Sequence, residues 1–133
     1  MPVDGNITLK SNIYNQSAHL FLYQNLYAEA LKMFKESYIC DSIANDSISV
    51  IYSLRDIAFT YDALGKRDCG RHYYNKAYEL ATNYGDEEIQ IDIVGQMAAH
   101  FLLTKDYKKM KEYLMRSLYS NVNKDKTIDY NLA

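Results

Sequence analysis

Proline is almost absent from this sequence, because Pro2 is its single occurrence. Proline disrupts a helix interior, so its absence leaves every later segment free to be helical. The two cysteines, Cys40 and Cys69, are too few for a framework of disulfides, which excludes the class of small disulfide-stabilised secreted domains. We expect both to be thiols in a reducing compartment.

An excess of either charge is also missing. The 15 Lys and Arg residues and 17 Asp and Glu residues give a formal net charge of −2. Nucleic-acid binding normally needs a basic surplus, so we expect no nucleic-acid partner through this segment. No apolar run approaches the roughly 18 residues that span a membrane, and residues 1–6 do not resemble a secretory signal. We therefore predict a cytoplasmic protein without a membrane partner.

Motifs for catalysis or for cofactor binding are absent as well. The sequence has no glycine-rich phosphate loop, no His-Glu-x-x-His, no Gly-x-Ser-x-Gly and no Cys-x-x-Cys. Cys69 and His72 lie one helical turn apart, but a second pair of metal ligands at suitable spacing is missing. His100 lies in an apolar run, which indicates a partly buried histidine rather than a catalytic base. We predict no enzymatic activity, no metal and no cofactor.

What the sequence does contain is an internal repeat with a period of 40 residues. A small residue recurs at Ala18, Ala58 and Ala98, and an aromatic residue follows three positions later each time, at Phe21, Tyr61 and Phe101. A period of this length is typical of stacked repeats rather than of a domain built around one catalytic pocket. We predict a single domain over 1–133, with repeats at about 6–45, 46–85 and 86–125.

Each repeat is predicted to be a pair of helices joined by a tight turn. The first helices are expected near 7–23, 47–64 and 87–103, and the second helices near 27–41, 67–82 and 107–120. Asn6, Asp46 and Asp86 stand where helix N-caps are expected. Apolar residues recur at helical spacing and not in alternation, so the predicted fold class is all-α.

The second repeat resembles a tetratricopeptide repeat (TPR). It reads Leu54-x2-Ile57-Ala58-x2-Tyr61, followed by Gly65, Gly70-x3-Tyr74 and Ala77. The other two repeats match the pattern at Tyr14, Ala18, Phe21, Tyr27, Ala30, Phe34 and Ser37, and at Val94, Met97, Ala98, Phe101, Tyr107, Leu114 and Ser117. The period exceeds the roughly 34 residues of that family, Met110 replaces a small residue, and the closing proline is missing. HEAT-type repeats have a period near 40, but their internal spacing fits less well.

The resemblance implies a right-handed superhelical stack of antiparallel helix pairs, an α-solenoid whose first helices line a concave face that binds a protein or peptide. The residues on that side are Asn12, Asn15, His19, Tyr52, Arg55, Phe59, Asp62, Asp92 and Gln96. Arg55 and Phe59 are four residues apart, so the guanidinium can lie over the ring. Alternatively, Tyr52 and Phe59 only pack against neighbouring helices. A clamp for a C-terminal carboxylate is not expected, because Asp56 and Asp92 would repel it.

The end of the sequence leaves two interpretations open. Residues 126–133 are either the start of a further helix or a frayed tail, and we favour a segment of a larger regulatory protein. In that case an apolar face is expected to be open at Tyr113, Leu114 and Leu118, where a partner or a second copy of the chain would bind. The two functional hypotheses are a peptide-binding module and a structural module that forms a homo-oligomer.

Overall fold

The computed structural model describes residues 5–124, apart from the side chains of residues 117 and 120–124. Within this range the regular structure consists of six helices: α1 (Gly5–Tyr23), α2 (Tyr27–Ile43), α3 (Ser47–Ala63), α4 (Arg67–Tyr84), α5 (Glu87–Leu103) and α6 (Tyr107–Lys124). Every predicted helix is present, and its ends differ from the prediction by at most four residues. The prediction for residues 126–133 falls outside the described residues.

Two of the three predicted N-caps are confirmed. The carboxylates of Asp46 and Asp86 accept hydrogen bonds from the backbone N–H of Ser49, at 3.1 Å, and of Ile89, at 2.9 Å. Each bond satisfies one of the donors that a helix start leaves without a partner. The prediction for Asn6 is wrong, because α1 begins at Gly5 and Asn6 lies inside the helix.

The turn within each helix pair uses a left-handed backbone conformation at one position. Asn25, Gly65 and Lys105 have φ angles of 59°, 79° and 60°, and they recur at the 40-residue period. Glycine and asparagine tolerate this conformation best, and lysine adopts it at a cost. The turns therefore reverse the chain sharply enough for the two helices of a pair to lie antiparallel.

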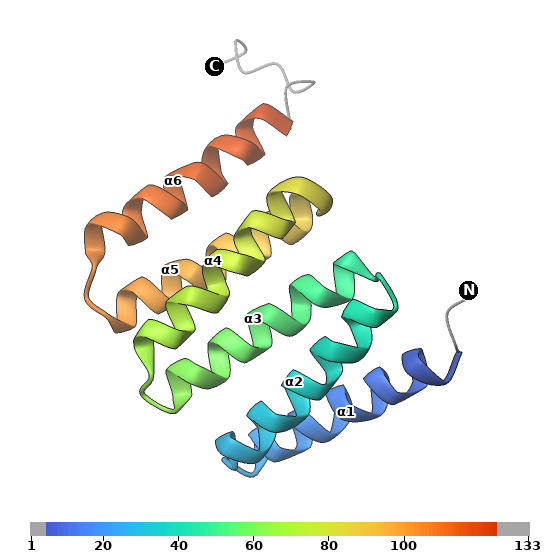
Figure 1. The fold of residues 1–133 in the computed structure, drawn as a ribbon. Coiled ribbons are helices and arrows are strands. Elements are labelled where there is room, and N and C mark those ends of the chain that lie inside the picture. The colour runs from blue at the N-terminus through green and yellow to red at the C-terminus, as the bar shows by residue number, and fades with distance from the viewer. Residues whose placement is uncertain (1–4, 125–133) are drawn as a thin grey trace.

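The helices stack in chain order as three pairs (Figure 1). α1 packs on α2, α3 on α4 and α5 on α6, and the pairs join where α2 meets α3 and α4 meets α5. Ala18 and Ala58 are fully buried, and Ala98 is nearly so, which lets neighbouring backbones approach closely. The large side chains of Phe34 and Tyr74 fill the spaces beside them.

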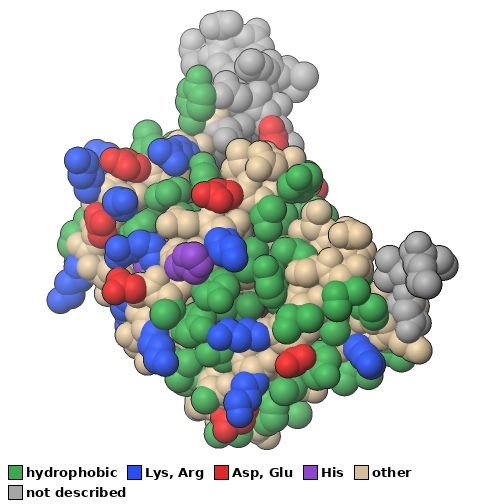
Figure 2. Space-filling model, viewed as in Figure 1, with side chains coloured by type: hydrophobic (Ala, Val, Ile, Leu, Met, Phe, Trp, Pro, Cys, Tyr) green, Lys and Arg blue, Asp and Glu red, His purple; other side chains and the backbone are tan. Residues whose placement is uncertain are grey.

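The surface shows no separation of the two charge signs on the face in view. Figure 2 shows basic and acidic side chains interspersed among hydrophobic ones. Among the six helices described, none is both long and apolar enough to cross a membrane.

Candidate functional site

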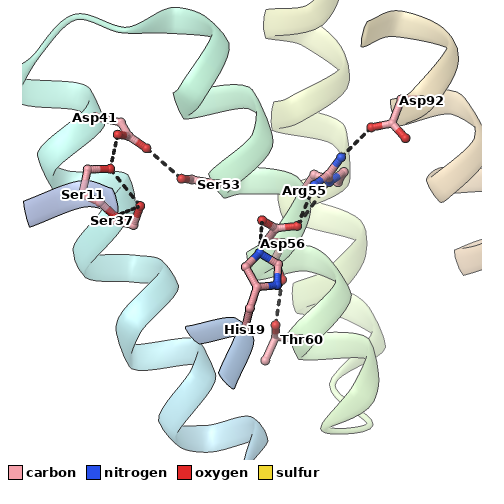
Figure 3. A network of polar contacts seen from close by, with 9 residues as sticks. All are labelled: Ser11, His19, Ser37, Asp41, Ser53, Arg55, Asp56, Thr60 and Asp92. Carbon is pink, nitrogen blue, oxygen red and sulfur yellow. Dashed lines mark hydrogen bonds and ion pairs between the residues drawn. The ribbon is translucent and has the colours of Figure 1, made fainter. Parts of the chain in front are cut away.

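The residues predicted to bind a ligand all belong to the first helices α1, α3 and α5, and we call the side that these helices line the groove face. Arg55 stands at its centre. Its Nη1 atom donates to Asp92 Oδ2 at 2.6 Å, and its Nε and Nη2 atoms donate to Asp56 Oδ1 at 3.2 Å and 3.1 Å (Figure 3). The guanidinium lies over the ring of Tyr52, 4.8 Å from its centroid. The predicted stacking on Phe59 is therefore wrong, and Tyr52 takes that role.

The contacts of Asp56 extend the Arg55 network to the first helix pair. His19 Nε2 on α1 lies 3.9 Å from Asp56 Oδ2. Asp56 is only 8% exposed, and this burial raises the pKa of its carboxyl, although the charge of Arg55 acts in the opposite direction. The network of His19, Asp56, Arg55 and Asp92 thus joins α1, α3 and α5. Because two carboxylates already engage Arg55, it positions these helices rather than offering a free cation.

A pocket of about 330 Å³ lies on one side of this network, where α3, α4 and α5 meet. We call it the mixed pocket, and its lining residues are Phe59, Asp62, Ala63, Arg67, Tyr74, Gln96, Ala99, His100 and Leu103. Phe59 is 48% exposed, whereas Tyr52 is partly buried and packs against the core. The alternative that these aromatic residues only pack against neighbouring helices therefore holds for Tyr52. The ring of Phe59 remains exposed at the pocket, where a ligand can contact it.

The inner wall of the mixed pocket is a buried acid–histidine pair. His100 Nδ1 lies 2.8 Å and 3.0 Å from the two carboxylate oxygens of Asp62, so this nitrogen carries the hydrogen that it donates. Asp62 and His100 are 5% and 1% exposed, which makes His100 fully buried and not partly buried as predicted. Arg67 Nη1 also donates to the backbone oxygen of Asp62 at 2.6 Å. Burial, together with the charge of Asp62, raises the pKa of the adjacent Tyr74.

A second pocket, of about 190 Å³, lies between α1, α2 and α3. We call it the polar pocket, because its lining residues are Ser11, Asn12, Asn15, Ser37, Asp41, Ser49, Tyr52 and Ser53. Asp41 is 6% exposed and accepts hydrogen bonds from the hydroxyls of Ser11 and Ser53, the latter at 2.9 Å (Figure 3). The hydroxyls of Ser11 and Ser37 lie 3.0 Å apart.

The sequence analysis did not predict the buried members of this pocket as binding residues, and it named Ser37 only as part of the repeat pattern. A signal was present, because polar residues replace apolar ones at equivalent repeat positions. The polar residues are Ser11, Ser37, Asp41 and Ser53. The residues 40 positions later are, in the same order, Ile51, Ala77, Ala81 and Ile93, and all four are buried in the core.

The residues predicted to form an oligomer interface have different surroundings. Tyr113 packs inward, with its ring stacked on Phe101 at 5.4 Å and edge-on to Tyr78 at 5.6 Å. Leu114 and Leu118 are 46% and 56% exposed. Tyr113 therefore belongs to the core of the last helix pair, and only the two leucines lie on the surface. Among the residues described, no group of three His, Cys, Asp or Glu side chains could hold a metal ion.

Comparison with known proteins identifies the fold. No protein-family model and no curated protein matches the sequence. A solved structure that matches is a crystal structure of nearly identical TPR-like repeats, from a Podosopora anserina protein assigned as a kinesin light chain. The TM-score is 0.76 at 12% sequence identity, and the match covers 87% of this chain and 57% of that chain. The chain is thus a TPR-like, all-α solenoid, as its sequence pattern predicted.

Proposed function

We propose that this chain is a non-catalytic module that binds a protein or peptide segment along the groove face. The observation that carries the proposal is the pair of pockets on either side of the Arg55 network. Six of the nine predicted binding residues line them: Asn12, Asn15, Tyr52, Phe59, Asp62 and Gln96. An extended peptide could place separate side chains in the two pockets, while the amides satisfy its backbone. A protein-binding role is also common among TPR-like folds, which is an argument from analogy.

The test uses Phe59→Ala combined with Gln96→Ala. Peptides that bind the wild-type protein are first selected from a displayed random library. Both substituted side chains reach the mixed pocket without supporting the core, so we expect affinity for the selected peptides to fall at least about tenfold, equivalent to about 1.4 kcal/mol. The melting temperature and the far-ultraviolet circular dichroism should stay unchanged.

The matched control is Leu102→Ala, which removes a side chain that is 54% exposed on α5 but does not line either pocket. It should leave peptide affinity unchanged. Arg55 is a poor target, because its removal would leave Asp56 and Asp92 without their cation. The proposal fails if no peptide is enriched, or if the double variant binds the selected peptides as tightly as the wild type does.

A second candidate function is self-association, and a comparison of equivalent repeat positions favours it. Leu114 is 46% exposed on α6, whereas Phe34 and Tyr74 at the same position are buried. On α1, Ile13 and Leu20 are 55% and 57% exposed, while the equivalent positions on α3 and α5 are buried. We infer that α1 of one copy packs on α6 of another copy, so that the stack continues head to tail. This contact between copies would resemble the contact between α2 and α3 within one chain.

Variants with one blocked end test this arrangement. We expect the wild-type mass, measured by light scattering, to rise with protein concentration, and Ile13→Lys or Leu118→Lys alone to remain monomeric. A mixture of the two variants retains one complementary pair of faces and should form a 1:1 dimer that grows no further. A wild-type protein that is monomeric at every concentration would contradict self-association. A mixture that stays monomeric while the wild type associates would contradict the head-to-tail arrangement.

A further inference from the structure

We propose that the polar pocket binds a primary ammonium group, supplied by a lysine side chain of the peptide on the groove face. The choice of a peptide as the source rests on the proposed function. The ammonium chemistry rests on the pocket itself.

The first argument is an uncompensated buried charge. Asp41 is 6% exposed, and its two carboxylate oxygens accept hydrogen bonds from the hydroxyls of Ser11 and Ser53. Among the side chains described, no Lys, Arg or His lies within ion-pair distance of Asp41. Buried charges in proteins are normally paired or bound to a cation, because desolvation otherwise costs too much. The pocket therefore holds a carboxylate that a cationic ligand would compensate.

The second argument is the chemistry of the remaining lining. Asn12 and Asn15 carry amide oxygens, and Ser37, Ser49 and Tyr52 carry hydroxyl oxygens. Each of these oxygens can accept a hydrogen bond, even where the hydroxyl donates elsewhere, as Ser49 does to Asp46 Oδ2 at 2.7 Å. The guanidinium on the ring of Tyr52 belongs to Arg55, whose charge Asp56 and Asp92 already engage. The pocket thus offers a cation several acceptors in addition to Asp41.

The third argument is shape, and it favours an ammonium at the end of a side chain. A volume of about 190 Å³ is below the roughly 300 Å³ at which pockets for small molecules begin. Each Asp41 oxygen already accepts one serine hydroxyl, so about one lone pair on each oxygen is left for a ligand, and a two-pronged guanidinium would have to compete with the two serines for the carboxylate. A lysine ammonium has three donors that rotate freely, and these suit single acceptors spread around a small cavity.

The first experiment titrates the full chain with n-butylammonium and follows amide chemical shifts by nuclear magnetic resonance. We expect saturable shifts at Ser11, Asn12 and Ser53, and none around Phe59. Tetramethylammonium has the charge without N–H donors, and n-butanol has the chain without the charge, so neither should reproduce the shifts. Asp41→Asn should abolish them. Equal shifts with tetramethylammonium, or unchanged binding by a folded Asp41→Asn variant, would overturn the proposal.

A second variant keeps the proposal testable if Asp41→Asn does not fold. Asn12→Lys places an ammonium at the pocket from the chain itself, and Asn12→Met is the uncharged control of similar length. We expect Asn12→Lys to melt a few degrees higher than Asn12→Met and to lose the butylammonium shifts. An equal or lower melting temperature for the lysine variant would contradict an unpaired charge at Asp41.

The two proposals can fail separately. If butylammonium binds in an Asp41-dependent manner while no peptide binds the groove face, the ammonium site stands and the proposed function falls. If selected peptides bind through the mixed pocket while butylammonium produces no shifts, the proposed function stands and the ammonium site is wrong.

Discussion

Replacing His100 with leucine is expected to lower the free energy of unfolding by about 1–3 kcal/mol, the usual cost of leaving a buried hydrogen-bond acceptor without its donor. His100 and Asp62 are 1% and 5% exposed, and Nδ1 lies 2.8 Å from the carboxylate. Leucine fills much of the space of the imidazole, so most of the loss should come from the stranded carboxylate rather than from a cavity. The loss of unfolding free energy is measured by urea denaturation at neutral pH, with circular dichroism as the signal.

The control for this prediction removes both members of the pair. Asp62→Ala combined with His100→Leu leaves no buried charge behind, so the double variant should lose less stability than the sum of the two single variants. A loss below about 1 kcal/mol for His100→Leu would contradict the prediction. Arg67, whose Nη1 atom lies 3.9 Å from Asp62 Oδ1, would then be enough to hold the carboxylate.

The helices could be predicted because their signals are local. Asp46 and Asp86 are confirmed as caps, and the apolar residues between the caps recur at helical spacing. The prediction that Asn6 caps a helix was wrong for a physical reason. An asparagine caps a helix only where the preceding backbone leaves the helical conformation, and in this chain Gly5 continues it.

The candidate site was predictable only in part, because the residues that contact one another in it are distant in sequence. The repeat pattern places Arg55 and Asp92 on the groove face, but it does not show that they meet across 37 residues. That contact depends on how far α5 is shifted along α3. The same holds for Asp62 and His100, 38 residues apart. Tyr52 and Phe59 lie three and four residues from Arg55 on the same helix, so spacing alone could not decide which of the two rings the guanidinium covers.

Replacing Gly70 with alanine is expected to destabilise the protein, although the same change in an open helix is stabilising by about 1 kcal/mol. Gly70 lies in the first turns of α4, and an added Cβ would lie 2.9 Å from Asp62 Cγ and 3.2 Å from the carbonyl oxygen of Ala58. Asp62 cannot yield easily, because His100 holds its carboxylate. We expect a net loss of about 1–3 kcal/mol, the range for overpacking, measured by urea denaturation.

Gly95→Ala is the matched control, because Gly95 lies within α5 and an added Cβ there would meet no atom within 4 Å. This change should raise the free energy of unfolding by about 0.5–1 kcal/mol. A stabilising Gly70→Ala would show that Asp62 moves aside at little cost.

The cause of the Gly70 effect can be separated by repeating the substitution in the Asp62→Ala background. If the carboxylate is what excludes a methyl group, Gly70→Ala should become neutral or stabilising once Asp62 is gone. If the loss persists, the carbonyl oxygen of Ala58 is responsible instead. The first repeat favours the former explanation, because buried Ala30 occupies the position of Gly70 where Leu22 replaces Asp62. A glycine is thus required only in the repeat that buries a carboxylate beside it.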